Sequence, residues 1–258
     1  MRKFLQKLYL GLICLFLYAP IFTLIVMSFN DTKTLGRWKG FTLNWYREVL
    51  SNDSIREALI NTLVIALVSA VVATIVGVAA CMGIMAMKAR TQRIVMQLTN
   101  IPLLNAEIVT ALALMLAFAM FGISLGMGTI LFSHITFCLP YVILNVMPKL
   151  RQTGKVAYEA ALDLGATPVY AFFKVIVPDI KPGIMSGFLM AFTMSVDDFI
   201  ITYFTRGAGI NTLSTLIYSQ VRVGIRPTIY ALSTIIFVIV LVVLLIANIR
   251  PERKQAKA

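Results

Sequence analysis

Residues 155–178, KVAYEAALDLGATPVYAFFKVIVP, form a polar, helix-forming stretch between two strongly apolar parts of the chain. Within residues 155–164, alanine and leucine side chains recur at spacings of three and four, which predicts a short helix with one apolar face. Gly165 is placed to end that helix, because glycine adopts the left-handed backbone conformation without a Cβ penalty. Pro168 suits the first turn of a helix, so a second short helix is predicted over residues 170–175.

The sequence around this stretch is that of an integral membrane protein. Hydrophobic residues make up 59% of the chain and charged residues only 13%, far from the usage of soluble proteins. Six apolar runs reach the length of about 20 residues that crosses a bilayer, at residues 8–29, 59–87, 101–122, 127–147, 183–203 and 231–249. We therefore predict an all-α, polytopic protein with six transmembrane helices in a single transmembrane domain over residues 1–258.

The first apolar run has a second interpretation. Arg2 and Lys3 precede it, as in a secretory signal peptide. The run is longer than a signal-peptide core, no small-x-small cleavage pattern follows Phe29, and Asn30 and Asp31 resemble the polar edge of a retained helix. We therefore expect a span that stays in the mature protein.

Lys and Arg are unequally distributed over the predicted loops, and cytoplasmic loops retain these residues. With the amino end inside, 15 of the 23 Lys and Arg fall in the segments 1–7, 88–100, 148–182 and 250–258. The outer segments 30–58, 123–126 and 204–230 hold the remainder. We therefore predict that both termini and the 148–182 loop are cytoplasmic.

The net charge of +12 raises a nucleic-acid partner as an alternative. The basic residues are scattered over loop ends and form no long basic run. This distribution favours a role in membrane topology and contacts with anionic lipid, so no nucleic-acid partner is expected.

Three carboxylates lie inside the predicted spans, and no Lys or Arg lies deep in any of them. Each costs at least about 2.5 kcal/mol to place at the bilayer centre, so it is treated as functional by default. Glu107 is expected a turn or two from the start of the third span, in its inner half. Asp197 and Asp198 are expected in the outer half of the fifth span. Such a line of negative sites suits a cationic substrate that moves inward.

These acids also have structural interpretations. Adjacent residues on a helix point about 100° apart, so one aspartate can bond a neighbouring side chain, with Thr193, Ser195 or Thr202 as candidates. Glu107 can instead hold an irregular helix start, and a proton relay is a further alternative. Tyr203 can offer its ring face to an amine or belong to an interfacial aromatic belt.

The remaining candidates point to packing. His134 is the only histidine, and we expect it to hydrogen-bond a neighbouring helix rather than bind a ligand. Cys14, Cys81 and Cys138 lie in apolar runs without CxxC spacing, which supports neither a disulfide framework nor a metal site. The sequence contains no catalytic constellation and no G-x-x-x-x-G-K-[ST] phosphate loop, so the chain is not expected to be an enzyme.

Five residues of the polar stretch have the spacing of the EAA loop of ABC importer permeases: Glu159, Ala160, Ala161, Gly165 and Pro178. The chain therefore resembles these permeases. Val175 and Val177 stand at the two aliphatic positions of that loop. Residues 132–140, 159–166 and 194–199 extend the resemblance, over nearly the whole chain, to the permeases of spermidine/putrescine importers.

The resemblance implies the transmembrane fold of type I ABC importers, with its core over about residues 57–250 and the 148–182 loop as the cytoplasmic coupling element. The residues implied to couple to an ATPase are Glu159, Ala160, Ala161, Asp163, Gly165 and Pro178. The residues implied to line the substrate path are Glu107, Asp197, Asp198 and Tyr203. Some family members have Asp where this chain has Glu107.

The implied partners are a second, homologous permease subunit, an ATPase dimer that binds ATP and Mg, and an external polyamine-binding protein. The chain itself would hold no cofactor and would lie in a bacterial cell membrane. Residues 46–50 and 213–223 are expected to form short amphipathic helices that contact the binding protein.

Two alternatives remain for the function. A related importer would carry another substrate, such as ferric iron or thiamine, whereas an oxyanion is disfavoured by the acidic pair. A secondary transporter would show inverted repeats or broken, paired helices, and the sequence indicates neither.

Overall fold

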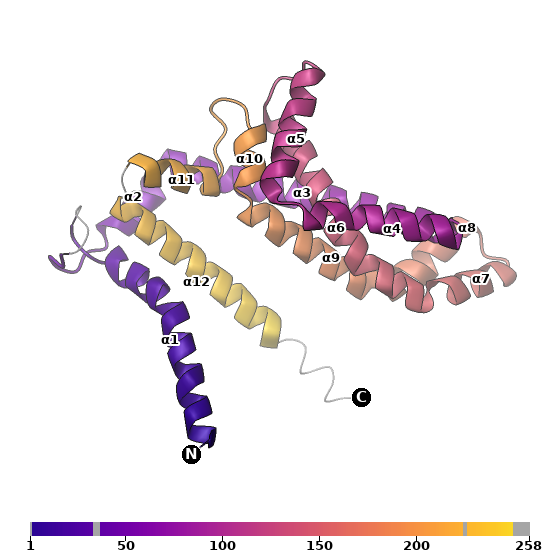
Figure 1. The fold of residues 1–258 in the computed structure, drawn as a ribbon, viewed down its shortest axis with the longest axis horizontal. Coiled ribbons are helices and arrows are strands. Elements are labelled where there is room, and N and C mark those ends of the chain that lie inside the picture. Colours follow the sequence, from indigo (N-terminus) through magenta and orange to yellow (C-terminus); the bar gives the residue numbers. More distant parts are fainter. Residues whose placement is uncertain (1, 33–36, 224–225, 250–258) are drawn as a thin grey trace. The chain divides into compact units, whose positions relative to one another are not determined.

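The structure, a computed structural model, describes residues 2–32, 37–223 and 226–249, which form helices and no β-strand (Figure 1). The helices are α1 (Arg2–Ser28), α2 (Asn44–Ser51), α3 (Asp53–Ala86), α4 (Ala89–Leu104), α5 (Glu107–Met120), α6 (Met127–Lys149), α7 (Lys155–Asp163), α8 (Pro168–Ala171), α9 (Val177–Asp197), α10 (Ile200–Thr205), α11 (Leu213–Val223) and α12 (Pro227–Ile249). Two π-helical segments are η1 (Leu150–Gly154) and η2 (Phe172–Ile176). The chain divides into a terminal unit, residues 1–56 with 216–258, and a central unit, residues 57–215. The all-α class is confirmed, whereas a single transmembrane domain stays a prediction.

Several helices have the length and composition of membrane spans. Four qualify alone: Gln6–Ser28, Asp53–Ala86, Met127–Gln152 and Pro168–Asp197. The bent pair α4 and α5 is a fifth if it counts as one span, and α12 is apolar over Pro227–Val238. The chain is therefore a multi-pass membrane protein, and the total of six spans stays a prediction.

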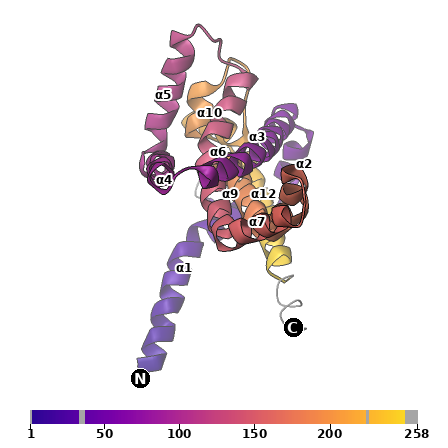
Figure 2. The same cartoon turned by 90° about the vertical axis from the view of Figure 1, so that its right-hand side faces the viewer.

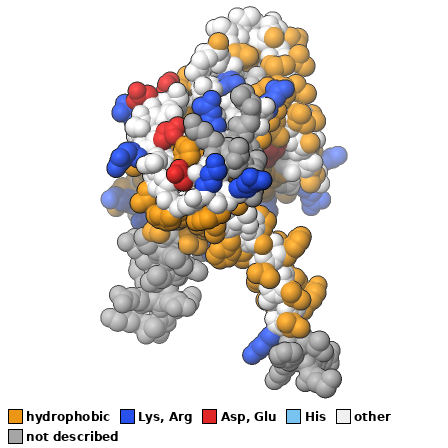
Figure 3. Space-filling model, turned by 90° about the vertical axis from the view of Figure 1, so that its left-hand side faces the viewer, with side chains coloured by type: hydrophobic (Ala, Val, Ile, Leu, Met, Phe, Trp, Pro, Cys, Tyr) orange, Lys and Arg blue, Asp and Glu red, His pale blue; other side chains and the backbone are white. Residues whose placement is uncertain are grey.

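In the terminal unit, α12 packs on α1 and α2. Hydrogen bonds close the segment between α1 and α2. The Tyr46 and Ser28 hydroxyls lie 2.5 Å apart, and Trp45 Nε1 donates to the Asn30 carbonyl at 2.9 Å. The short helices predicted over residues 46–50 and 213–223 are confirmed as α2 and α11. Figure 3 shows apolar side chains along the exposed surface of α1, as expected for contact with lipid or another subunit.

The antiparallel pair α6 and α9 forms the core of the central unit. Small residues recur every fourth position on the buried face of α9: Gly183, Gly187, Ala191 and Ser195. Ala191 accepts a hydrogen bond from Cys138 Sγ at 3.3 Å, and Ser186 Oγ donates to Asn145 Oδ1 at 3.0 Å. Small residues at such spacing allow close approach of two helices in a membrane. This four-residue spacing is visible in the sequence and was the signal available for the contact.

Val142 on α6 is held between glycines of two other helices. A Cβ at Gly77 would lie 2.6 Å from Val142 Cγ1, and one at Gly187 would lie 3.3 Å from Val142 Cα. We expect Gly77→Ala to destabilise the protein by about 1–3 kcal/mol, because overpacking displaces neighbouring atoms. Gly83→Ala, also on α3, is the matched control, since its Cβ would meet nothing within 4 Å. Thermal unfolding of the purified variants checks this, and equal midpoints would contradict it.

The third span is broken, which the sequence analysis did not anticipate. α4 and α5 are bent by 103° at the two residues between them. Glu107 lies at this bend, as the first residue of α5, and its distance from the start of the membrane span stays a prediction. Arg90 and Arg93, interpreted as loop residues, lie in helix α4.

The fifth predicted span is also interrupted, and its helix is longer than the predicted span. The helix runs from Pro168 to Asp197, and the predicted start of the membrane-spanning part at Gly183 stays a prediction. The π-helical turn η2 carries the chain up to Pro178, which has no N–H to donate and would crowd a regular helical turn. Beyond Asp197 the backbone is extended at Asp198, and Phe199 leads into α10.

Candidate functional site

Glu107 and Asp197 lie at the two helix breaks. Glu107 is the first residue of α5, Asp197 is the last residue of α9, and both side chains are exposed. α5 packs along α10, and both helices rise from their breaks in the same direction (Figures 1 and 2). The structure therefore brings the two carboxylates to the same end of one helix pair. The predicted placement of Glu107 in the inner half assumed a third span that begins at Ile101.

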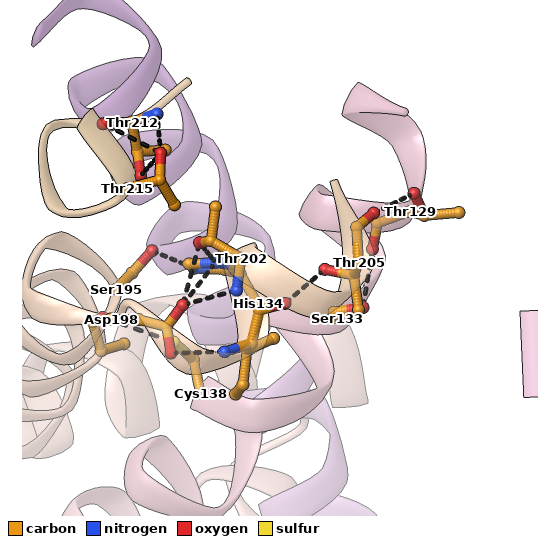
Figure 4. Close-up of polar contacts among 12 residues, drawn as sticks. Thr129, Ser133, His134, Cys138, Ser195, Asp198, Thr202, Thr205, Thr212 and Thr215 are labelled. Atoms are coloured by element: carbon orange, nitrogen blue, oxygen red, sulfur yellow. Dashed lines mark hydrogen bonds and ion pairs between the residues drawn. The ribbon is translucent and has the colours of Figure 1, made fainter. Parts of the chain in front are cut away.

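Asp198 is buried and bonds to α10 (Figure 4). Its Oδ1 accepts from the Ile201 backbone N–H at 3.1 Å. Its Oδ2 accepts from the Thr202 backbone N–H at 2.8 Å and from the Thr202 hydroxyl at 2.9 Å. The first N–H groups of a helix have no partner within it, and a negative charge is favourable there. Asp198 therefore caps α10 directly after the break.

His134 on α6 connects this cap to α9 (Figure 4). Its Nε2 lies 2.9 Å from Thr202 Oγ1 and 3.4 Å from Asp198 Oδ2, and its Nδ1 lies 2.6 Å from Ser195 Oγ. Because the Thr202 hydroxyl donates to the carboxylate, it accepts from Nε2–H, and in the neutral ring Nδ1 accepts from Ser195. The expectation that His134 bonds a neighbouring helix is confirmed. We call His134, Ser195, Asp198 and Thr202 the His134 cluster.

The two adjacent aspartates have opposite surroundings. The Asp198 side chain is 1% exposed, whereas Asp197 is exposed. The structural alternative considered for one of the pair, a bond to Thr202, is found for Asp198. Thr193 instead bonds within its own helix, to a carbonyl at 2.7 Å. Asp197 is therefore the member of the pair that is open to a substrate, and substrate contact by Asp198 stays a prediction.

Tyr203 on α10 is 37% exposed, but a cation already lies beside its ring. The Arg206 guanidinium carbon is 5.6 Å from the ring centroid. Arg206 in turn donates to the Ile210 carbonyl at 3.2 Å and to the Asn211 side chain. A substrate amine would share this aromatic group with Arg206, a residue that our sequence analysis did not consider. The signal available in the sequence for this contact was the three-residue spacing between Tyr203 and Arg206.

The polar stretch folds largely as predicted. The helix expected over residues 155–164 is α7, and Gly165 ends it with a positive φ of +87°. The Gly165 N–H donates to the Leu162 carbonyl at 2.9 Å, and the next N–H donates to the Ala161 carbonyl at 3.0 Å. This pair of bonds is a Schellman motif. Thr167 then caps α8, which begins with Pro168 and so starts two residues before the predicted helix.

The coupling residues are mostly accessible at the end of the central unit that holds α7. Glu159, Ala160, Asp163, Gly165 and Pro178 are exposed, and Ala161 is half-buried. Four apolar side chains that the sequence analysis did not assign to the ATPase contact are also exposed: Leu164 at 90%, Val169 at 68%, Tyr170 at 57% and Phe173 at 62%. α7 packs against η1 and η2, which continue into α6 and α9. α7 is therefore connected to the α6–α9 pair through η1 and η2.

The cysteines and the acids form no metal site in the part of the chain that the structure describes. No group of three or more His, Cys, Asp or Glu comes together there. Cys81 Sγ donates weakly to the Ile143 carbonyl at 3.8 Å, and Cys138 packs against α9. Cys14 lies exposed on α1.

The geometry defines a class of protein: a multi-pass helical membrane protein with carboxylates at broken spans and an exposed helix between two spans, as in transporters. The chain belongs to the family of binding-protein-dependent transport system inner membrane components, whose model matches residues 73–253. It is therefore a permease subunit of a transport system.

Three relatives illustrate the similarity. The spermidine/putrescine transport system permease protein PotC of Haemophilus influenzae is 35% identical over 248 residues, covering 96% of each chain. PotC of Escherichia coli K12 is 36% identical over 234 residues, covering 91% of this chain and 89% of the relative. The putrescine transport system permease protein PotI of Escherichia coli K12 is 39% identical over 228 residues, covering 86% of this chain and 81% of the relative.

The family also bears on the secondary-transporter alternative. Broken spans, which the sequence did not indicate, do occur at α4–α5 and α9–α10. They do not point to a secondary transporter here, because the family consists of subunits that depend on a binding protein.

Proposed function

We propose that this chain is one of two permease subunits of an ATP-driven polyamine importer that moves spermidine or putrescine inward by alternating access. The observation that carries the proposal is the pair of exposed carboxylates, Glu107 and Asp197, at breaks on neighbouring helices of an apolar protein. A polyamine carries ammonium groups spaced along a flexible chain, so separated carboxylates suit it. The names of the relatives support the same substrate class.

The break after Asp197 adds to the attraction for cations. The carbonyls that end α9 form the partly negative end of a helix beside Asp197, and these groups also favour an ammonium group. Glu107 lies instead at the amino end of α5, where the backbone N–H groups favour its carboxylate form. We propose that the amines exchange onto these positions when the path opens outward.

The energy would come from a separate ATPase dimer that binds ATP and Mg, since this chain has no phosphate loop. We propose that the ATPase docks on α7 in the cytoplasm through Glu159, Ala160 and Ala161, with the exposed Leu164 and Tyr170 adding apolar contact. Its closure would move α7, then η1 and η2, then the α6–α9 pair. A second permease would complete the path, and an external binding protein would contact α2 and α11.

Uptake of labelled spermidine by proteoliposomes that contain the assembled complex tests this proposal. Uptake is expected only with ATP inside and binding protein outside, and putrescine is expected to compete. Uptake driven by an ion gradient without ATP would favour a secondary transporter. Competition by thiamine or ferric iron, but not by polyamines, would favour an importer of another substrate.

Gly165 provides a test of the coupling element. Gly165→Val is expected to cost about 1–3 kcal/mol locally, because a β-branched residue is strained at a φ of +87°, so ATP-driven uptake should fall. Gly165→Asn is the matched control, since asparagine tolerates this conformation and an added Cβ meets nothing within 4 Å. Uptake and ATP hydrolysis are measured together. Equal uptake by both variants would contradict a role for this helix end.

A further inference from the structure

A basic groove lies between residues 89–100 of α4 and Arg151 in η1. Its volume is about 350 Å³. The lining residues are Ala89, Gln92, Arg93, Met96, Gln97, Asn100 and Arg151. Every charged group among them is a guanidinium, and three carboxamides supply further donors. A groove of this composition attracts an anion with several acceptor oxygens.

The two arginines are available to such an anion. Arg93 and Arg151 are exposed, and among the described residues no carboxylate lies within ion-pairing distance of either one. Arg93 belongs to α4 and Arg151 to the segment that follows α6, so a ligand between them would bridge two elements. A guanidinium presents a planar fork of donors that matches a phosphate.

An apolar strip on α4 indicates which kind of phosphate fits. Ile94, Leu98 and Ile101 are 50%, 56% and 49% exposed and follow one another at helical spacing. They lie along the same length of α4 as the groove residues Arg93 to Asn100, at other positions around the helix. A free phosphate would use the groove alone, whereas a phospholipid with its headgroup in the groove could also place its acyl chains against these exposed apolar side chains.

We propose that this groove binds the headgroup of an anionic phospholipid in the cytoplasmic leaflet. Basic pockets on the cytoplasmic side of membrane helices are suited to such headgroups. The leaflet rests on the proposed orientation of the chain, in which residues 88–100 and 148–182 are cytoplasmic. The bound lipid would hold α4 against η1, the segment that also contacts α7.

The test uses the complete transport complex in nanodiscs, and the readouts are native mass spectrometry of retained lipid and the thermal unfolding midpoint. Phosphatidylglycerol is expected to be retained and to raise the midpoint relative to phosphatidylcholine. Arg93→Gln combined with Arg151→Gln is expected to weaken phosphatidylglycerol binding on the order of tenfold to thirtyfold. Arg90→Gln is the matched control, because Arg90 lies exposed on α4 outside the groove.

Three results would overturn the proposal. The first is equal retention of the two lipids, or unchanged retention in the double variant. The second is full stabilisation by inorganic phosphate alone, which would indicate a soluble anion instead. The third is a crosslink from an Arg93→Cys variant to another subunit with no lipid displaced, which would indicate a protein interface.

ATP-driven uptake of spermidine by the same complexes tests the proposed transport function separately. If the double variant loses lipid binding but retains uptake, the lipid is not needed for transport, and the lipid site itself is still supported. Absence of uptake by the unaltered complex, with phosphatidylglycerol still retained, refutes the proposed function and leaves the lipid site standing.

Discussion

Replacing Asp198 with alanine is expected to lower the stability of the folded protein by about 3 kcal/mol or more, whereas the same change at Asp197 leaves it nearly unchanged. Three donors of α10, the Ile201 and Thr202 backbone N–H groups and the Thr202 hydroxyl, lose their acceptor in a buried position, and nothing in the cluster replaces it. A buried polar group that is left without a partner lowers the free energy of unfolding by its full desolvation penalty. Asp197 is exposed, so its removal leaves no buried group unpaired.

The thermal unfolding midpoint of the purified complex in detergent is the measurement. Asp198→Asn should fall between the unaltered protein and Asp198→Ala, because the amide keeps one acceptor oxygen but loses the charge. His134→Ala should also lower the midpoint, since it removes the link from Thr202 to Ser195. If Asp198→Ala unfolds at the normal temperature but abolishes uptake, Asp198 is a substrate ligand rather than a helix cap.

The parts of the fold that the sequence predicted well depend on neighbours along the chain. α7 and its end at Gly165 follow from local spacing, because a Schellman motif needs only residues within six positions of one another. α2 and α11 follow from amphipathic spacing in the same way. The anchors from Glu159 to Pro178, on which the predicted coupling element rests, are also close to one another in the sequence.

The helix breaks could not be predicted in this way, because their causes are remote in sequence. An apolar run has the same hydropathy whether its helix is straight or broken. The break after Asp197 persists because Asp198 caps the next helix and His134, more than sixty positions earlier, holds that cap. Sequence alone therefore predicted that one of the two adjacent aspartates can bond a neighbouring side chain but not which one, whereas packing identifies Asp198 as the bonded residue and Asp197 as the exposed one.

The second large effect is expected on transport, from Glu107→Gln combined with Asp197→Asn. A hydrogen bond to a charged group contributes about 1.5 kcal/mol or more, so each single change should lower the kcat/KM of spermidine uptake roughly tenfold. The breaks lie on neighbouring helices, so the two effects add only if each carboxylate binds a separate amine. An additive loss on the order of a hundredfold would indicate two separate amine sites, and a smaller loss would indicate one shared site.

The controls for this pair separate binding from folding. Both side chains are exposed, so the unfolding midpoint should stay unchanged, in contrast to Asp198→Ala. Asp179→Asn, which removes an exposed acid at the start of α9, should leave uptake intact. Glu107→Asp should retain most of the activity, because it keeps the negative charge at the first turn of α5. Normal uptake by the double variant would contradict the proposed cation path, since the only other acid among the assigned path residues, Asp198, is already occupied by α10 and His134.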